Sequence, residues 1–221
     1  MNDTNPFGSM PTHEAFFKKC GKRLEYDKNE RFIHANDPRR YLYYIEEGHV
    51  KISWTLDSGD ERLIAILPAG ISLRQQHSIY DVGDGMFDAT TFTPSVIWRV
   101  PEELFFQQMG SDIHFTNELT MQGFRAKDYL IDQLVCLGEP TIYRRALRWL
   151  LLMAHWYGTP TDSGTAIALP LTQETIGSFL HASRASVSPV MGALAEKGFI
   201  RVQNKRMTVL DIDGVRAELG I

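Results

Sequence analysis

Short polar side chains gather near the C-terminal end of the chain, and their types suit hydrogen bonding to a polyanion. The set consists of four hydroxyl groups and one guanidinium, on Thr172, Ser183, Arg184, Ser186 and Ser188. Hydroxyls donate hydrogen bonds to phosphate oxygens, and a guanidinium can bond twice to the edge of a guanine. The chemistry that these residues can perform is the recognition of a nucleic acid.

Two short helices joined by a tight turn are predicted to hold this set. Thr172 can cap a helix that runs to Leu180, and Ser183 is a natural cap for a second helix. Val187, Val190, Met191 and Leu194 recur at helical spacing until Lys197 and Gly198 end the second helix. This is a helix-turn-helix pattern, whose second helix fits the roughly 12 Å wide major groove of DNA.

A β-hairpin is predicted directly after the two helices. Its strands are residues 199–203 and 206–212, and the turn between them is Asn204-Lys205 rather than the favoured Asn-Gly. A hairpin in this place makes the pattern a winged helix-turn-helix. Residues 139–221 are therefore predicted to form a DNA-binding domain.

The first half of the chain has the pattern of short strands separated by turns. Apolar and β-branched runs at 41–45, 49–54, 61–67 and 88–100 alternate with Gly-, Asp- and Pro-containing turns. About six to eight strands at this spacing are typical of a small barrel or sandwich. We assign residues 1–111 to this β domain, which a short helix after Pro101 closes.

A long helix is predicted between the two domains, at residues 112–138. One apolar stripe on it contains Ala126, Leu130, Leu134 and Leu137, and a second contains Phe124, Ile131 and Val135. Two stripes need two partners. We expect the second stripe to face the chain's own β domain and the first to pair with the same helix of a second copy. A single-chain arrangement, with the helix between its two domains, is the alternative.

Composition and charge restrict the class of protein. The chain has 221 residues, 43% hydrophobic and 23% charged, as expected for a globular protein of two domains. It has no apolar run of the roughly 20 residues that cross a membrane and no signal-peptide pattern at its start, so we expect a cytoplasmic protein. Cys20 and Cys136 are too few for a metal cage within one chain.

Charge is unevenly distributed along the chain. Residues 1–138 carry 14 Lys and Arg against 20 Asp and Glu, a net charge of −6, whereas residues 139–221 carry 9 against 7, a net charge of +2. Contact with a nucleic acid is thus expected in the C-terminal third. Catalytic motifs such as HExxH, GxSxG or a Walker loop are absent from the sequence, and acidic pairs such as Glu46-Glu47 are adjacent and point apart, so no enzyme is predicted.

The stretch from Leu171 to Ile200 resembles the winged helix-turn-helix of the cyclic-AMP receptor/fumarate-nitrate regulator family (CRP/FNR). The resemblance implies an α+β fold: an N-terminal β-roll, which is a cyclic-nucleotide-binding-like jelly roll, then a long dimerisation helix and a C-terminal winged helix-turn-helix. The same order of β domain, long helix and helix-turn-helix is predicted from the residue patterns. Within the family the sequence resembles the clostridial halorespiration regulators, through residues 70–73, 88–95 and 140–142.

The resemblance implies a homodimeric, sequence-specific transcription regulator controlled by a small effector. Its partners would be a palindromic operator in double-stranded DNA and the effector, with RNA polymerase as a further candidate and no membrane. The residues implied for DNA binding are Thr172, Ser183, Arg184, Ala185, Ser186 and Ser188. Those implied for effector binding are Arg74, Gln75, His77, Phe87, Thr90, Met121 and Phe124. The dimer interface would contain Ala126, Leu130, Leu134 and Leu137.

Departures from the family pattern qualify what is carried over. Members that bind cyclic AMP have an arginine and a hydroxyl residue where this chain has Phe87-Asp88, whose ring and carboxylate would repel a phosphodiester. Cys20 stands alone, so no iron–sulfur cluster is expected. No cofactor is expected otherwise, except that His77 lies near the haem-ligand position of the carbon-monoxide-sensing branch, which leaves a haem-based sensor as an alternative.

The recognition helix also departs from the family. There the arginine equivalent to Arg184 reads guanine, a glutamate often follows it, and another arginine comes four residues later; this chain has Ala185 and Pro189. Pro189 lacks the N–H that would bond to Ala185, so the helix is expected to bend there or to start later. A small-molecule-binding protein with a degenerate helix-turn-helix is a further alternative.

Overall fold

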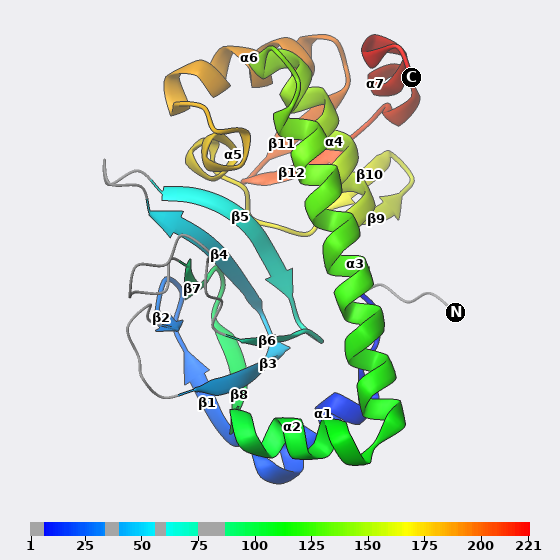
Figure 1. Cartoon of the computed structure of the whole chain (residues 1–221). Coiled ribbons are helices and arrows are strands. Elements are labelled where there is room, and N and C mark those ends of the chain that lie inside the picture. Colours follow the sequence, from blue (N-terminus) through cyan, green and yellow to red (C-terminus); the bar gives the residue numbers. More distant parts are fainter. Residues whose placement is uncertain (1–6, 34–39, 56–60, 75–86) are drawn as a thin grey trace. The chain divides into compact units, whose positions relative to one another are not determined.

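The computed structural model describes residues 7–33, 40–55, 61–74 and 87–221 (Figure 1). Its contacts divide the chain into two compact units, Met1–Ala126 and Lys127–Ile221. Helix α3 (Ile113–Leu137) is continuous across the division, as the predicted long helix requires.

Two antiparallel four-stranded sheets build the first unit. One has the order β1-β8-β3-β6, with β1 (Lys22–Tyr26), β8 (Ser95–Pro101), β3 (Tyr41–Glu47) and β6 (Ser72–Arg74); the other has the order β2-β7-β4-β5, with β2 (Arg31–Ile33), β7 (Phe87–Thr91), β4 (His49–Thr55) and β5 (Glu61–Pro68). Both sheets contribute fully buried side chains, among them Ile45, Ile97, Val50 and Ile66. The predicted β domain is confirmed, although its strands begin with β1 at Lys22, well before the first predicted run at 41–45.

Helix α1 (Pro11–Cys20) precedes the sheets and was not predicted from the sequence. Its buried side chains Phe16 and Phe17 join an apolar cluster with Leu42, Tyr44, Val100, Phe105 and Phe115. The signal was present in the sequence, because Met10, His13 and Phe17 are buried at spacings of three and four residues. What was missing is a helix-start signal, because the N-cap residue Met10 has no capping side chain.

Helix α2 (Glu102–Ser111) leads into α3, and Pro101 lies at its N-cap rather than at its first helical position. On α3 the side chains buried by the chain itself are Phe115, Tyr129, Gln133 and Cys136. Phe124, which lies in the first unit, is 53% exposed, so the expectation that it packs on the chain's own β domain is wrong. Ile131 and Val135 lie in the second unit and are 50% and 49% exposed. The face that packs on its own unit mixes aromatic and polar residues, which an apolar pattern does not reveal.

The second unit contains α4 (Ile142–Tyr157), β9 (Gly158–Thr161), β10 (Gly164–Ile167), α5 (Gln173–Leu180), α6 (Arg184–Glu196), β11 (Ile200–Gln203), β12 (Arg206–Val209) and α7 (Ile212–Leu219). The strands form one sheet of order β11-β12-β10-β9. Trp149, Leu150, Phe179, Val187 and Leu194 are fully buried and form the core. The predicted helix-turn-helix and its hairpin are both present, whereas α7, which Asp211 caps, was not predicted.

The wing turn shows why Asn-Lys serves as a hairpin turn. Asn204 and Lys205 both have positive φ angles, 50° and 62°, which is the combination of a type I′ turn. Asn tolerates positive φ angles well, whereas Lys at the second position adopts one at a cost in free energy that glycine would avoid.

Within the described residues no helix is long and apolar enough to cross a membrane.

Candidate functional site

Side-chain caps fix the two helices of the helix-turn-helix. The Thr172 hydroxyl accepts a hydrogen bond from the Thr175 N–H at 3.1 Å, and the Ser183 hydroxyl accepts one from the Ser186 N–H at 3.2 Å. The turn between the helices is tight: His181 has a left-handed φ of 50°, and a Cβ on Gly177 would lie 2.7 Å from the Ala182 carbonyl oxygen. Both predicted caps are confirmed, and Gly177 is required by the close approach.

The residues predicted for DNA binding lie together on the solvent side of this motif. All six are exposed, while Val187, Met191 and Leu194 turn the opposite face of α6 into the core. The Gln173 amide also reaches this side, because its Nε2 donates to the Ser188 hydroxyl at 3.3 Å and so joins α5 to α6. Gln173 was not predicted, since only the folded motif brings residues 173 and 188 together.

Helix α6 runs without interruption from Arg184 to Glu196 and contains Pro189. The expected later start of the helix does not occur, because the Ser183 cap fixes its first turn. Along the exposed face, small residues follow Arg184: Ala185, Ser188, Pro189 and Gly192. A Cβ on Gly192 would meet no atom within 4 Å. In the first two turns of this face, Arg184 is the long side chain and the residues after it are small.

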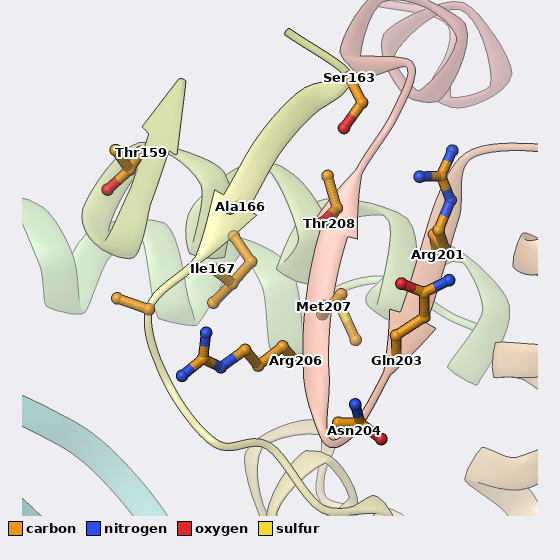
Figure 2. A pocket seen from close by; sticks show the side chains of 11 residues that line it. Thr159, Ser163, Ala166, Ile167, Arg201, Gln203, Asn204, Arg206, Met207 and Thr208 are labelled. Carbon is orange, nitrogen blue, oxygen red and sulfur yellow. The ribbon is translucent and has the colours of Figure 1, made fainter. Parts of the chain in front are cut away.

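The outer face of the wing sheet is concave and polar. A hollow of about 880 Å³ lies over β9, β10, β11 and β12, and Figure 2 shows Arg201, Gln203 and Arg206 around it. Arg201 pairs across the strands with Thr208, and Gln203 with Arg206, so these side chains share one face of the sheet. Within the described part of the chain, neither guanidinium has an ion-pair partner, so both are available to an anion.

A small cavity lies inside the first unit, where the predicted effector residues were expected. Its volume is about 40 Å³, and it is lined by Ile33, Ile52, Leu67, Leu73, Arg74, Phe87, Asp88 and Ala89. Asp88 forms an ion pair with Arg31 at 3.0 Å, and Arg74 lies 3.7 Å from a carboxylate oxygen of Glu102. The lining is therefore mainly apolar, with both of its charged residues paired to groups outside the cavity.

The predicted effector residues are only partly brought together. Arg74 and Phe87 line the cavity, whereas Thr90 is buried elsewhere in β7, and Met121 and Phe124 are exposed on α3. Gln75 and His77 lie outside the described residues. Among the residues that the structure describes, no group of three His, Cys, Asp or Glu side chains is placed to hold a metal ion.

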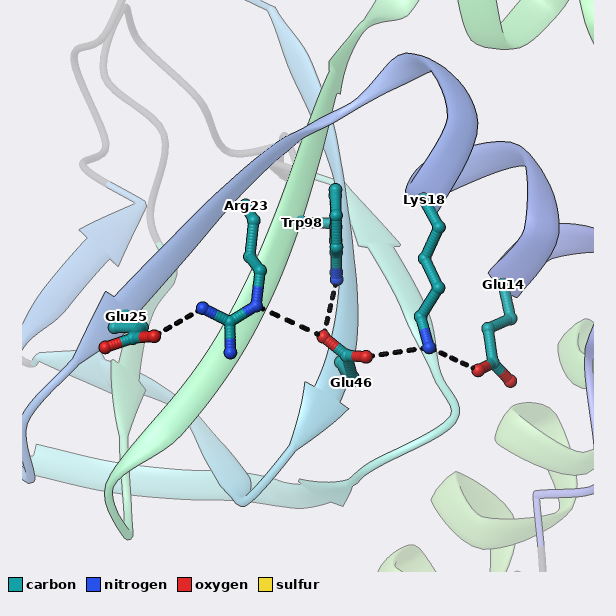
Figure 3. Close-up of polar contacts among 6 residues, drawn as sticks. All are labelled: Glu14, Lys18, Arg23, Glu25, Glu46 and Trp98. Atoms are coloured by element: carbon teal, nitrogen blue, oxygen red, sulfur yellow. Dashed lines mark hydrogen bonds and ion pairs between the residues drawn. The ribbon is translucent and has the colours of Figure 1, made fainter.

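A chain of charged side chains connects α1 to the sheet (Figure 3). The Glu46 carboxylate accepts a hydrogen bond from Trp98 Nε1 at 2.7 Å, and Lys18 Nζ lies 2.7 Å from it; Lys18 also pairs with Glu14, and Arg23 with Glu25. The pKa of Glu46 lies below its ordinary value, mainly because its carboxylate is hydrogen-bonded to Lys18. Each charge has a partner, so this network reads as structural.

Comparison with known families agrees with the geometry in both units. Residues 23–112 match the cyclic nucleotide-binding domain, and residues 144–218 match the Crp-like helix-turn-helix domain. Together the two matches cover most of the chain, in the order that the structure shows. The chain belongs to the CRP/FNR family. Members of this family are transcription regulators and not enzymes, which confirms the prediction made from the sequence.

Individual relatives are distant but match along most of their length. The global nitrogen regulator of Synechococcus elongatus is 24% identical over 196 residues, covering 85% of each chain. The CRP-like cAMP-activated global transcriptional regulator of Mycobacterium tuberculosis is 24% identical over 204 residues, covering 92% of this chain and 91% of its own.

Solved structures of the family share the fold. A CooA mutant from Carboxydothermus hydrogenoformans superposes with a TM-score of 0.78 at 17% identity, covering 93% of this chain and 90% of its own. FixK2 from Bradyrhizobium japonicum superposes with a TM-score of 0.72 at 18% identity, covering 89% and 96%. The predicted fold, with its β domain, long helix and C-terminal helix-turn-helix, is thereby confirmed.

Proposed function

We propose that the chain is a homodimeric transcription regulator that reads a palindromic operator through α6 and responds to a small effector in the β domain. In this proposal residues 1–111 sense the effector, 112–138 form the dimer and 139–221 bind DNA. The observation that carries it is the exposed Arg184 on the first, capped turn of α6. A guanidinium in that place can bond to both acceptors of a guanine.

The remaining DNA contacts are assigned by side-chain chemistry. Thr172, Ser183 and Ser186 carry hydroxyls at the two helix N-termini, whose free N–H groups favour phosphate oxygens. The Ala185 methyl group can make an apolar contact with the methyl group of a thymine. Arg201 and Arg206 on the wing add positive charge that no described acidic side chain neutralises, which suits the phosphate backbone. Arg184 is then the main base-reading residue of each subunit.

The dimer is supported by the apolar side chains that α3 leaves in solvent. Leu130, Ile131, Leu134 and Val135 are all at least 45% exposed on one helix. A monomeric protein rarely leaves such a continuous apolar strip uncovered. The same helix of a second copy, packed as a coiled coil, covers it and places two α6 helices for two half-sites.

The effector is proposed to be small, mainly apolar and not a cyclic nucleotide. Among the described residues that line the cavity, the one cation, Arg74, is paired with Glu102, and Asp88 adds a carboxylate to the wall. A volume of about 40 Å³ is also far below the several hundred Å³ of ordinary ligand pockets. An effector of drug-like size would therefore have to displace part of the wall. Native mass spectrometry and an absorption spectrum of freshly purified protein would reveal a retained ligand, or haem.

The proposal is tested by selecting binding sequences from random double-stranded DNA with the full chain, followed by footprinting. We expect an inverted repeat with half-site centres one helical turn, or about 34 Å, apart. A footprint limited to one half-site at saturating protein would contradict the dimer. Failure to retain any DNA would contradict the regulator and favour the small-molecule-binding alternative.

A further inference from the structure

Strand β6 lies at the edge of its sheet, and a side chain takes the place of its missing neighbour. On one side β6 pairs with β3, from Tyr44 opposite Ser72 to Leu42 opposite Arg74. On the other side the Ser72 N–H donates to Gln122 Oε1 at 3.0 Å, and Gln122 Nε2 donates to the Ser72 carbonyl at 2.6 Å. The Gln122 amide thus satisfies both backbone groups of Ser72, as an adjacent strand would.

A buried histidine makes a second connection to the same residue. The His13 ring is fully buried and stacks on Phe115, with 3.7 Å between ring centres. Its Nε2 lies 2.9 Å from the Phe115 carbonyl, which can only accept, so Nε2 carries the proton. The neutral Nδ1 then accepts from the Ser72 hydroxyl at 3.0 Å. His13 therefore joins α1, β6 and α3.

Helices α1 and α3 are themselves joined by a carboxylate. The N-cap residue of α1, Met10, has no capping side chain, and the Thr12 and His13 N–H groups instead donate to Glu118 of α3 at 3.0 to 3.1 Å. A carboxylate at a helix N-terminus is electrostatically favourable. His13 and Gln122 consequently belong to one α1–α3 body, and both hold Ser72.

The strand that they hold contributes to the effector cavity. Leu73 and Arg74, the two residues after Ser72, line it. An effector that shifts the backbone at Leu73 acts directly on its neighbour Ser72, whose polar groups are engaged by α3 and α1. On the same helix, Met121 and Phe124 flank Gln122 in the sequence and are half exposed, on the part of α3 that belongs to the first unit.

We propose that Ser72, Gln122 and His13 form a latch that transmits the state of the effector cavity to α3. The three are positioning residues and need not touch the effector. The latch rests on the proposed function, because it couples the cavity to the DNA-binding helices through α3. It predicts that a change at either end is felt at the other, since coupling between two binding sites is reciprocal.

Reciprocity allows the latch to be tested before the effector is known. The probe is the operator DNA that the wild-type chain selects from random sequence, and the readout is amide hydrogen exchange at residues 72–74 with and without that DNA. In the wild type, DNA should change this exchange by about fivefold or more, the low end of ordinary allosteric coupling. Gln122→Ala should reduce the DNA-induced change to less than about twofold while α6 still becomes protected by DNA.

Three variants separate the latch from a structural role. Gln122→Glu keeps the shape but loses the donor to the Ser72 carbonyl, and Ser72→Ala removes only the bond to His13, so both should weaken the response even if Gln122→Ala folds poorly. Asn117→Ala, at an exposed position of α3, should leave it unchanged. A purely structural role would speed exchange at residues 72–74 equally with and without DNA, leaving their ratio as in the wild type.

The outcomes distinguish the latch from the proposed function. An unchanged DNA-induced ratio in the Gln122 variants, or wild-type protein that binds DNA with no response at residues 72–74, would overturn the latch and leave the regulator in place. A wild-type chain that selects no DNA would overturn both. Loss of the response in Gln122→Glu and Ser72→Ala, with normal DNA protection of α6, supports the latch.

Discussion

At the scale of single residues, His13 gives the molecule a stability that depends on pH. Burial lowers the pKa of His13 below its ordinary value of about 6.5, so His13 binds a proton more weakly in the folded chain than in the unfolded chain. As the pH falls below 6.5, the unfolded state gains protons that the folded state does not, and the free energy of unfolding decreases. The contribution is present above this pH and is lost below it.

This dependence is tested by measuring the free energy of unfolding in urea for His13→Gln and for the wild type, at pH 8 and at pH 5.5. The variant should be less stable at pH 8, because the ring packing is lost, and this deficit should shrink at pH 5.5, because only the wild type loses the stability that depends on a neutral His13. His49 also has a pKa lowered by burial, but it is present in both proteins. The exposed His114→Gln is the control. Equal deficits at both pH values would contradict the role of His13.

Arg184 tests the DNA-binding assignment at single-residue resolution. Arg184→Ala should cost about 1 to 3 kcal/mol of operator binding and relax the preference at one base pair, because a bidentate contact to guanine is lost. Ser183→Ala should weaken all sequences alike, because a phosphate contact carries no sequence information. Binding to an operator library measures both. Ser183 also caps α6, so the folded fraction is measured alongside.

A uniform loss across the library for Arg184→Ala, with no position relaxed, would mean that this arginine contacts phosphate only.

The helix-capping residues were predictable from the sequence because their contacts are local. The Thr172 and Ser183 side chains each accept a hydrogen bond from the N–H group three residues later. The latch was not predictable, since Ser72 is separated from His13 by 59 positions and from Gln122 by 50. No local pattern marks a pair that only the fold brings together.

At the scale of elements, α6 carries two residues that cost it stability. Pro189 removes the N–H that would bond to the Ala185 carbonyl, and Gly192 is exposed in the helix interior with open space around it. Pro189→Ala should raise the free energy of unfolding by about 1 to 3 kcal/mol, and Gly192→Ala by about 1 kcal/mol. Denaturant unfolding of each variant measures this. A Pro189→Ala chain no more stable than the wild type would show that the backbone has adapted to the proline.

Elements with a strong period or a clear cap were predictable, and those that depend on distant partners were not. Helix α5 begins after its Thr172 cap as the sequence indicated, and the hairpin of β11 and β12 follows its turn residues. Helix α1 was missed because its N-terminus is capped by Glu118, more than a hundred positions away. On α3 the period was identified correctly, but not which face packs on its own chain, because exposed Ile131 and Val135 look the same in sequence as buried residues.

At the scale of the whole molecule, the proposed dimer depends on the exposed apolar strip on α3. Leu130, Ile131, Leu134 and Val135 recur every three or four residues, and Leu134 is the most exposed at 69%. Leu134→Glu would place a carboxylate from each subunit in the centre of a symmetric helix pair, where burial and like charge both oppose association. The variant should therefore be a monomer, whereas we expect the wild type to have twice the 25.2 kDa mass of one chain.

Sedimentation equilibrium or native mass spectrometry measures the mass, and operator binding measures the consequence. A monomer holds one half-site, so its affinity for the inverted repeat should fall by orders of magnitude, while the wild type gains from the linked second contact by about 100-fold or more. Ile221→Glu, which charges an exposed apolar residue at the C-terminus, should remain dimeric and bind as the wild type. A Leu134→Glu chain that stays dimeric would move the interface away from this strip, and a monomeric wild type that protects both half-sites would separate operator symmetry from the dimer altogether.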